Sequence, residues 1–362
     1  MTASGRKQGK MPARQVSVQL HPELFGESEK LIARSGSLTA TAFRYGSGVA
    51  GLRVDNGVGT VTLLPFQGQQ VWDAAFLGRS LAMRSMFDEP QPTRDYLSTY
   101  GALFLHCGGT AMGNPGPADT HPLHGELPNI PYTSAQLVLG EDDAGGYADL
   151  TGIARDTLAF DHDFVSRPRV RLREGSTVLD IAINVENRAS KPLAFFYLAH
   201  INFRPADGGL LIDTVRSDDS SIVMRQPASA EASEWDAASF RSLKAGVAIE
   251  PEAVLMLKPE TGEDGCAHAL HRRPDGTGDF VSYRPSELPY AVRWITRSGD
   301  QDALGLLLPA TAAPNGRAAA IKENQIVWIE PGASYDASLR FGAADAEAAS
   351  RLEAEILTIR DS

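Results

Sequence analysis

The chain has 362 residues, and its 34 lysines and arginines against 45 aspartates and glutamates give a formal net charge of −11. An acidic chain whose only basic stretch lies at its start is a poor ligand for nucleic acid, so we expect no nucleic-acid partner. Two cysteines, Cys107 and Cys266, are too few for a disulfide framework or a zinc ribbon. They suit a reducing compartment, and we expect a cytoplasmic protein.

Targeting segments are also not expected. The first residues carry positive charges, but no apolar run follows them, so a secretory signal is not predicted. No stretch approaches ~20 consecutive apolar residues, and a membrane partner is therefore not expected.

In chain order, the first elements are a tail, a strand and a short helix. Residues 1–14 are polar and basic and are predicted to be a disordered tail, whereas residues 15–362 are predicted to form a single domain. Gln15–Leu20 alternates as a strand does. Leu24–Ala33 has the pattern of a short helix.

From Leu38 onward, short apolar runs broken by Gly, Pro, Asn and Asp recur to about residue 341. Asn56-Gly57 between two such runs is typical of a hairpin. Val178–Glu186 alternates most cleanly, and only Ala343–Ile359 has helical spacing. Many short strands with turns between them predict an all-β sandwich or barrel of antiparallel sheets with a short C-terminal helix.

Ionisable residues inside apolar strands are the first candidates for a site. In Phe195–Phe203, alternation places His200 and Asn202 on the same face, where they are predicted to hold a polar ligand. His106 stands in the similar run Tyr100–Cys107. For each histidine, the alternative is a hydrogen-bonded structural role, which is the commoner one for such residues.

His121, His124 and Glu126 lie within six residues, in a segment rich in glycine and proline. Their spacing resembles that of metal ligands, but the prolines argue against a helix, and the helical zinc-protease interpretation therefore fails. A loop of this composition remains a candidate for supplying ligands to Zn²⁺ or a similar ion.

The other histidines carry less signal: His162 is expected in an exposed turn, and His268 and His271 in a solvated hairpin region. The sequence has no nucleophile elbow, phosphate-binding glycine loop or dinucleotide fingerprint. Acid–base catalysis by imidazoles is the most economical enzymatic interpretation, because histidine titrates near neutral pH. Trp72 and Trp294 are candidates for stacking on a sugar face, with core packing as the alternative.

Four segments, in order, together resemble the aldose 1-epimerase (galactose mutarotase-like) superfamily, most closely a bacterial branch of it. Three of them are Cys107-Gly108-Gly109, Leu123-His124-Gly125 with Asn129 and Pro131, and Tyr197–Phe203 with its His-x-Asn-Phe core. The fourth is the C-terminal run Leu288–Trp294, Leu304–Thr311, Gly316-Arg317 and Glu330–Gly332. Each motif is short, but their order and spacing over residues 38 to 342 are fairly specific.

The resemblance implies a β-supersandwich with a cleft on its concave face, and a carbohydrate ligand. Mutarotases protonate the ring oxygen of a sugar and deprotonate its anomeric hydroxyl, so that the ring opens and recloses on either face. By resemblance, His200 is the acid at the ring oxygen, and His124 binds or polarises the anomeric oxygen. The residues expected to bind substrate are His106, His121, Asn129, Asn202, Arg79, Trp72, Arg293 and Trp294.

One departure from the family pattern concerns the general base. The family has a glutamate on a late strand, whereas this chain has Leu308 there. Glu126 is the first candidate to replace it as a catalytic residue. Alternatively, a divalent metal such as zinc activates a sugar hydroxyl or carbonyl. The ligands would then come from His106, His121, His124, Glu126 and His200. Otherwise no cofactor is expected.

Three hypotheses remain open on the sequence. The first is an isomerase that resembles aldose 1-epimerase and acts on a free sugar or sugar derivative. The second is a metal-assisted isomerase, epimerase or lyase on a keto- or acid sugar. The third is a non-catalytic carbohydrate-binding protein, which the missing glutamate favours. All three imply a small-molecule carbohydrate as partner, and a homodimer is compatible with each.

Overall fold

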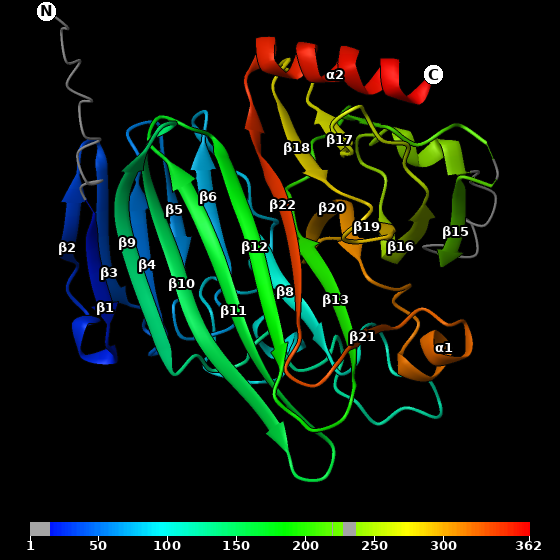
Figure 1. Ribbon diagram of the computed structural model, residues 1–362. Helices are drawn as coiled ribbons and strands as arrows, with labels where there is room; N and C mark the ends of the chain where they lie inside the picture. Colours follow the sequence, from blue (N-terminus) through cyan, green and yellow to red (C-terminus); the bar gives the residue numbers. More distant parts are fainter. Residues whose placement is uncertain (1–14, 219, 227–236) are drawn as a thin grey trace, which may run out of the picture.

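The structure is a computed structural model that describes residues 15–218, 220–226 and 237–362. Two large sheets face each other and share one hydrophobic core (Figure 1). Every pairing between named strands is antiparallel in the described part of the chain, so the all-β sandwich expected from the sequence is confirmed. The predicted disordered tail lies outside the described residues.

The smaller sheet has nine strands. In spatial order they are β1 (Val16–Leu20), β9 (Ser134–Asp142), β10 (Gly145–Leu158), β11 (His162–Arg173), β12 (Val178–Asn187), β22 (Ser334–Ala344), β18 (Gly278–Tyr283), β17 (Ala267–Arg272) and β14 (Leu210–Asp213). In β12 the burial alternates residue by residue, as the sequence predicted, so that one face of this sheet lies on the core and the other faces outward.

The larger sheet has thirteen strands, eleven of them in one path. That path is β15 (Ile222–Gln226), β16 (Ile249–Leu257), β19 (Tyr290–Arg297), β20 (Asp302–Ala310), β13 (Leu193–Ile201), β8 (Phe104–Gly109), β6 (Val71–Phe76), β5 (Gly59–Leu63), β4 (Ala50–Asp55), β3 (Leu38–Arg44) and β2 (Lys30–Ser35). Off the path, β21 (Val327–Ile329) pairs with β13, and β7 (Arg79–Ser80) pairs with β6.

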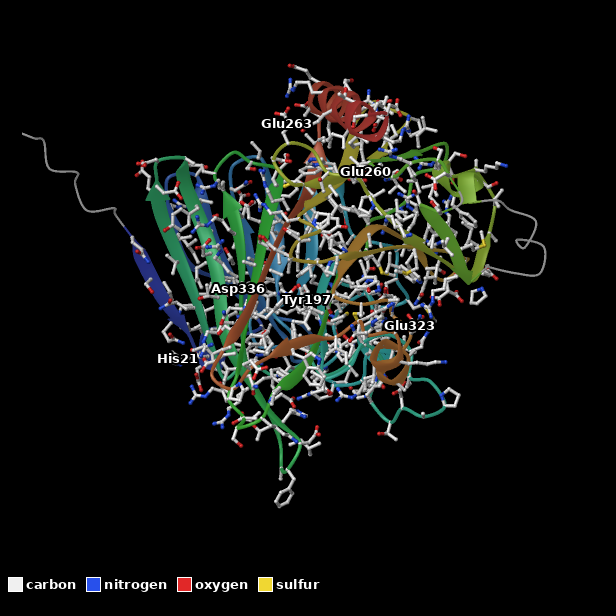
Figure 2. All side chains as sticks on the ribbon, turned by 45° about the vertical axis from the view of Figure 1, so that its right-hand side comes forward. His21, Tyr197, Glu260, Glu263, Glu323 and Asp336 are labelled. Carbon is white, nitrogen blue, oxygen red and sulfur yellow. The ribbon has the colours of Figure 1, made fainter. Side chains whose placement is uncertain are left out.

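Aromatic side chains join the two sheets across the core. Phe104 of β8 stacks on Phe341 of β22 with ring centroids 5.6 Å apart, and Phe203 meets the same ring edge-on at 6.1 Å. Tyr197 of β13 is fully buried and lies inside the molecule in Figure 2. Burying each such side chain stabilises the fold by roughly 1.5–3 kcal/mol. Strand β13, in the middle of the larger sheet, is therefore buried along its whole length.

Among the described residues, two α-helices accompany the sheets, α1 (Arg317–Lys322) and α2 (Ala346–Arg360). Helix α2 agrees with the predicted C-terminal helix, begins at the N-cap Asp345, and packs Ile356 against Leu270 and its neighbours. No helix among the described residues is long and apolar enough to cross a membrane.

The helix predicted over Leu24–Ala33 is wrong. A single 3₁₀ turn at Pro22–Leu24 is followed by strand β2, which pairs with β3. Partner strands supply the backbone hydrogen bonds here, and this tertiary pairing overrides the helical spacing of the apolar residues.

Three histidines expected in solvated positions are buried instead. His162 is 8% exposed and lies between Asp156 and Asp161, whose hydrogen bonds raise the pKa of His162 to about 9. His271 and His268 belong to β17, which lies between β14 and β18, rather than to the turn that follows it. The polar turn at residues 272–276 begins only where β17 ends, so its composition says nothing about the burial of the two histidines before it.

Candidate active site

A cavity of about 630 Å³ lies against the larger sheet. Its floor comes from four neighbouring strands, β13, β20, β19 and β16. The floor residues include Leu198, His200, Leu308, Val292, Trp294, Glu252 and Val254. Segments before and after β8, around residues 86–100 and 113–124, supply the walls. A cavity of this volume suits a small polar ligand.

His124 enters the cavity because two glycine motifs meet. The backbone NH of Gly108 donates to the carbonyl of His124 at 2.8 Å, and the NH of Glu126 donates to the carbonyl of Gly108 at 2.9 Å. His124 and Gly125 both have left-handed backbone, with φ of 59° and 76°. A Cβ at Gly125 would lie 2.3 Å from the carbonyl oxygen of Ala111, so only glycine fits there.

The structure brings His124 and His200 together, although 76 positions separate them in the chain. Their rings are perpendicular, with centroids 5.4 Å apart. Tyr96 lies 4.9 Å from the ring of His124, and Trp294 lies 5.4 Å from the ring of His200. Two imidazoles thus border one volume, with aromatic faces on either side.

Burial controls the charge of both imidazoles. It lowers the pKa of His124 to about 3 and that of His200 to about 4. Nδ1 of each ring is buried without a hydrogen-bond partner among the described residues, which leaves Nε2 as the nitrogen that a ligand can reach. Both rings are therefore neutral near pH 7.

A hydrogen-bonded group holds the aromatic wall. Tyr100 donates from its hydroxyl to Oδ1 of Asn202 at 3.2 Å, and Nδ2 of Asn202 donates to the carbonyl of Ala102 at 3.0 Å. Trp294 donates from Nε1 to Oε2 of Glu252 at 2.5 Å. Asn202 thus positions Tyr100 and does not line the cavity itself, whereas Trp294 does.

The cavity residues that were not predicted from the sequence include Tyr96, Tyr100, Glu252 and Arg225. Glu252 left a detectable signal, since it is the acidic residue directly before the apolar run at residues 253–257 of the strand Ile249–Leu257. The two tyrosines precede an apolar run and read as ordinary core residues.

Glu126 does not line the cavity. Its Oε2 accepts a hydrogen bond from the NH of Thr110 at 2.7 Å, and its Oε1 accepts one from the hydroxyl of Thr110 at 2.8 Å. The extended backbone that would point His124 and Glu126 the same way is absent, because His124 is left-handed. Glu126 instead fastens its own segment to the end of β8.

Two of the candidate metal ligands, His106 and His121, lie apart from His124 and His200. His106 lies between the sheets with Nδ1 2.8 Å from the hydroxyl of Tyr197, and burial lowers the pKa of His106 to about 3. His121 lies 3.7 Å from Asp119, beside α1. In residues 15–218, 220–226 and 237–362, no group of three or more His, Cys, Asp or Glu side chains is arranged to hold a metal ion.

Two further residues that were predicted to bind substrate lie outside the cavity. Asn129 accepts hydrogen bonds at Oδ1 from Gln67 at 3.1 Å and from Gln70 at 2.8 Å. Trp72 lines a separate open hollow on the larger sheet. Neither borders the volume between His124 and His200.

The two predicted arginines are held in ion pairs away from the cavity. Arg79 pairs with Asp279 at 2.5 Å, and the fully buried Arg293 pairs with Asp213 at 2.7 Å. Each guanidinium is thus already neutralised by a buried carboxylate. Arg293 stands next to Trp294 in β19, but the alternation of the strand turns the two side chains to opposite faces.

The two facing antiparallel sheets, the short C-terminal helix and the cavity on the larger sheet define an aldose 1-epimerase-like fold. A protein from Klebsiella pneumoniae subsp. pneumoniae MGH 78578, provisionally named aldose 1-epimerase, has a similar structure with a TM-score of 0.84, 17% identity and 96% of each chain covered. A galactose mutarotase-like protein from Clostridium acetobutylicum has a TM-score of 0.58 at 15% identity, with 85% of this chain and 99% of that chain covered. These identities show the fold alone.

The chain belongs to the family described as Domain of unknown function (DUF4432), whose model matches residues 46–343. A third similar structure, provisionally named aldose 1-epimerase, comes from Escherichia coli K12. Its TM-score is 0.51 at 13% identity, with 79% of this chain and 96% of that chain covered. No curated protein matches the chain.

Proposed function

We propose that the protein is a carbohydrate-active isomerase that works at the anomeric centre of a sugar, with chemistry of the aldose 1-epimerase type. The observation that carries the proposal is the meeting of His124, His200 and Glu252 around one cavity. The fold, shared with proteins named for this activity, supports the same conclusion.

Ring opening needs two proton movements at neighbouring oxygens. The anomeric hydroxyl loses a proton, the ring oxygen gains one, the bond between C1 and the ring oxygen breaks, and C1 becomes a carbonyl. Reclosure on the other face of the carbonyl reverses each movement, so no proton or electron is gained overall. The enzyme therefore needs a proton acceptor and a proton donor on opposite sides of C1.

Glu252 is the proton acceptor in this proposal. It is the one carboxylate that lines the cavity among the described residues, and Leu308 on the same floor is apolar. Oε2 of Glu252 accepts a hydrogen bond from Trp294, while Oε1 has no hydrogen-bond partner in the described part of the chain. Both oxygens of Glu126, by contrast, are held by Thr110.

His200 is the donor at the ring oxygen, and His124 holds the anomeric oxygen. Burial depresses the pKa of His200 to about 4, so the ring is neutral near pH 7 and offers its N–H to the ring oxygen as a hydrogen-bond donor. Tyr96, Tyr100 and Trp294 offer aromatic faces on which the apolar side of a sugar ring packs.

A pair of matched variants tests the choice of base. The interconversion of the two anomers is followed by NMR for a panel of aldoses and sugar acids. Glu252→Gln should lower turnover by roughly 10²–10⁴-fold, because an amide cannot accept the proton. Glu126→Gln, the control, should keep most of its turnover. Loss in the control alone, or no turnover of any panel sugar by the wild type, contradicts the proposal.

His200→Ala tests the donor. Removing the imidazole should lower turnover by roughly 10²–10⁴-fold while circular dichroism stays that of a folded β protein. The control is His106→Asn, since His106 is equally buried but lies outside the cavity. An unchanged rate in His200→Ala would remove this residue from the mechanism.

One observation favours an acid sugar as the substrate. Arg225 is the only cationic side chain, apart from the histidines, that lines the cavity among the described residues, and it forms no ion pair with any of them. An unpaired guanidinium at the cavity edge suits a carboxylate or phosphate on the substrate. Arg225→Gln should therefore raise KM for an acid sugar and leave KM for the neutral sugar unchanged.

A further inference from the structure

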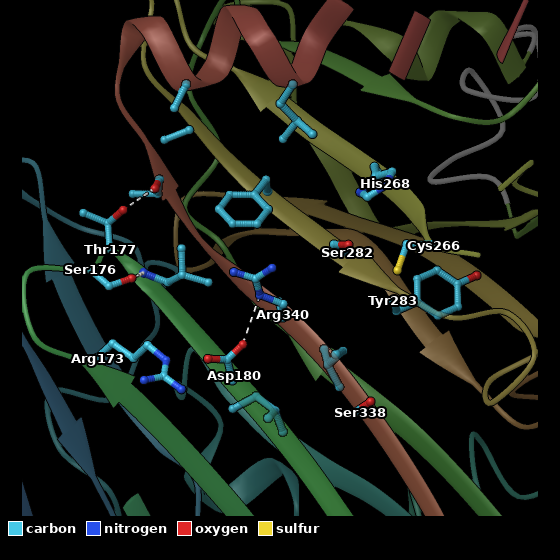
Figure 3. A pocket seen from close by; sticks show the side chains of 18 of the residues that line it. Arg173, Ser176, Thr177, Asp180, Cys266, His268, Ser282, Tyr283, Ser338 and Arg340 are labelled. Atoms are coloured by element: carbon cyan, nitrogen blue, oxygen red, sulfur yellow. Dashed lines mark hydrogen bonds and ion pairs between the residues drawn. The ribbon is translucent and has the colours of Figure 1, made fainter. Parts of the chain in front are cut away.

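A second and larger hollow of about 900 Å³ lies on the outward face of the nine-stranded sheet, beside α2 (Figure 3). Five neighbouring strands, β11, β12, β22, β18 and β17, form its base. No residue lines both this hollow and the cavity at His124. We call it the outer groove.

Strand register places one continuous row of polar side chains across the outer groove. Directly opposed residues on neighbouring strands point to the same side of a sheet. The opposed residues, in order from β10 to β17, are Asp149, Arg171, Asp180, Arg340, Ser282 and His268. Figure 3 shows its part from Asp180 through Arg340 and Ser282 to His268. Because strands lie ~4.8 Å apart, the five strands of the base span about 19 Å.

The row alternates hydrogen-bond acceptors and donors with little net charge. Arg171 forms two hydrogen bonds to Asp149, at 2.6 and 2.7 Å, and Arg340 pairs with Asp180 at 3.0 Å. Ser282 both donates and accepts. The row itself does not attract a polyanion, because its two arginines are each paired with an aspartate.

Two polar groups of the outer groove lack partners. His268 is 7% exposed, and its Nε2 is buried with no hydrogen bond in the described part of the chain. Arg169, on the same face of β11, has no carboxylate partner there, and its Nε is also unsatisfied. Buried polar groups without partners are costly, and a ligand or water that reaches them restores the lost hydrogen bonds.

Apolar side chains complete the groove. Phe280 of β18 and Leu352 of α2 line it beside the polar row. Polar groups of alternating type next to apolar surface suit a molecule that has hydroxyls along its edges and C–H groups on its faces. An extended peptide fits less well, because it usually pairs with an open strand edge, and the base here consists of strands already paired on both sides.

We propose that the outer groove is a second carbohydrate-binding site, which takes a linear, uncharged oligosaccharide lying across strands β11 to β17. The proposal is for binding alone, and no catalytic step is assigned to this site. Its residues are independent of those proposed for isomerisation. The two proposals therefore fail separately.

The test is calorimetric titration of the full chain with cellohexaose, maltohexaose and xylohexaose at millimolar concentration. The wild type is expected to bind at least one of them. Ser282→Trp should abolish this binding by filling the groove, and Arg340→Ala should weaken it about tenfold through the loss of a charged donor. Arg351→Ala is the matched control, because Arg351 is an exposed, ion-paired arginine outside the groove, and its binding should equal that of the wild type.

Separate readouts distinguish this site from the cavity. Ser282→Trp should keep the anomer interconversion rate of the wild type, and His200→Ala should keep the oligosaccharide affinity. Absence of binding for all three hexasaccharides overturns the proposal. So does binding that persists in both Ser282→Trp and Arg340→Ala, or that disappears in Arg351→Ala. Should Ser282→Trp fail to fold by circular dichroism, Arg340→Ala decides the matter.

Discussion

The two cavity histidines make the stability of the protein depend on pH. Their pKa values in the fold, about 3 for His124 and about 4 for His200, lie below the ordinary value of 6.5. As pH falls below 6.5, these two histidines become protonated in the unfolded chain. In the folded chain they stay neutral until the pH reaches their lower pKa values, so the unfolded state binds more protons and is favoured. The contribution to stability is therefore complete above pH 6.5 and is lost as pH falls toward 4.

Urea unfolding at pH 7 and pH 5 measures this effect. We expect a lower free energy of unfolding at pH 5, and a smaller difference in the double variant His124→Asn, His200→Asn, which lacks the titrating rings. His162 has a raised pKa and acts in the opposite sense, but it is present in both chains and drops out of the comparison. Equal pH dependence in the two chains would contradict the assigned shifts.

At the scale of elements, the segment 123–126 and the end of β8 act as one unit. The parallel bridge between Gly108 and Gly125 joins them, and Glu126 adds its two hydrogen bonds to Thr110. Gly109 allows this approach, because a Cβ there would lie 2.1 Å from Oε2 of Glu126. The function of Glu126 in this arrangement is to position the backbone that carries His124.

Gly125→Ala should disrupt the unit. The added methyl group meets the carbonyl oxygens of Ala111 and Gly108 at 2.3 and 2.4 Å, in addition to the strain of a positive φ. Gly78→Ala is a matched control, since Gly78 has φ 75° against 76° and open space around its Cβ. We expect Gly78→Ala to cost about 1–2 kcal/mol of unfolding free energy.

Gly125→Ala should cost clearly more than Gly78→Ala and should also lower turnover, because His124 is displaced. Chemical denaturation and the anomer assay report the two effects. Equal losses of stability in both variants, with turnover intact, would show that the close contact at Gly125 is not important.

At the scale of the whole molecule, the fold places three of the candidate metal ligands outside the cavity. His106 faces the core between the sheets, His121 lies near α1, and Glu126 is bound to Thr110. We therefore expect anomer interconversion to survive dialysis against a chelator, with unchanged turnover. Loss of activity on chelation, restored by zinc, would contradict this and revive the metal-assisted hypothesis.

Local pattern was sufficient for the architecture and for two site residues. Alternation in Val178–Glu186 and the hairpin at Asn56-Gly57 predicted strands that the structure contains. His200 stood out because an apolar strand needs no imidazole, and His124 because of its glycine-rich motif. Each of these signals depends on a few adjacent residues, which is why the sequence alone carries it.

The sequence by itself thus determined an all-β sandwich and pointed to His124 and His200, since strand periodicity and turn residues act locally. Only the tertiary structure decided which side chains share a volume with them. Glu252 reaches the cavity because β16 lies in the same sheet as β13, three strands away. No local sequence pattern encodes this strand order. Glu126 is turned away by the left-handed backbone of His124 and Gly125, and the burial of His268 depends on strands and a helix far along the chain.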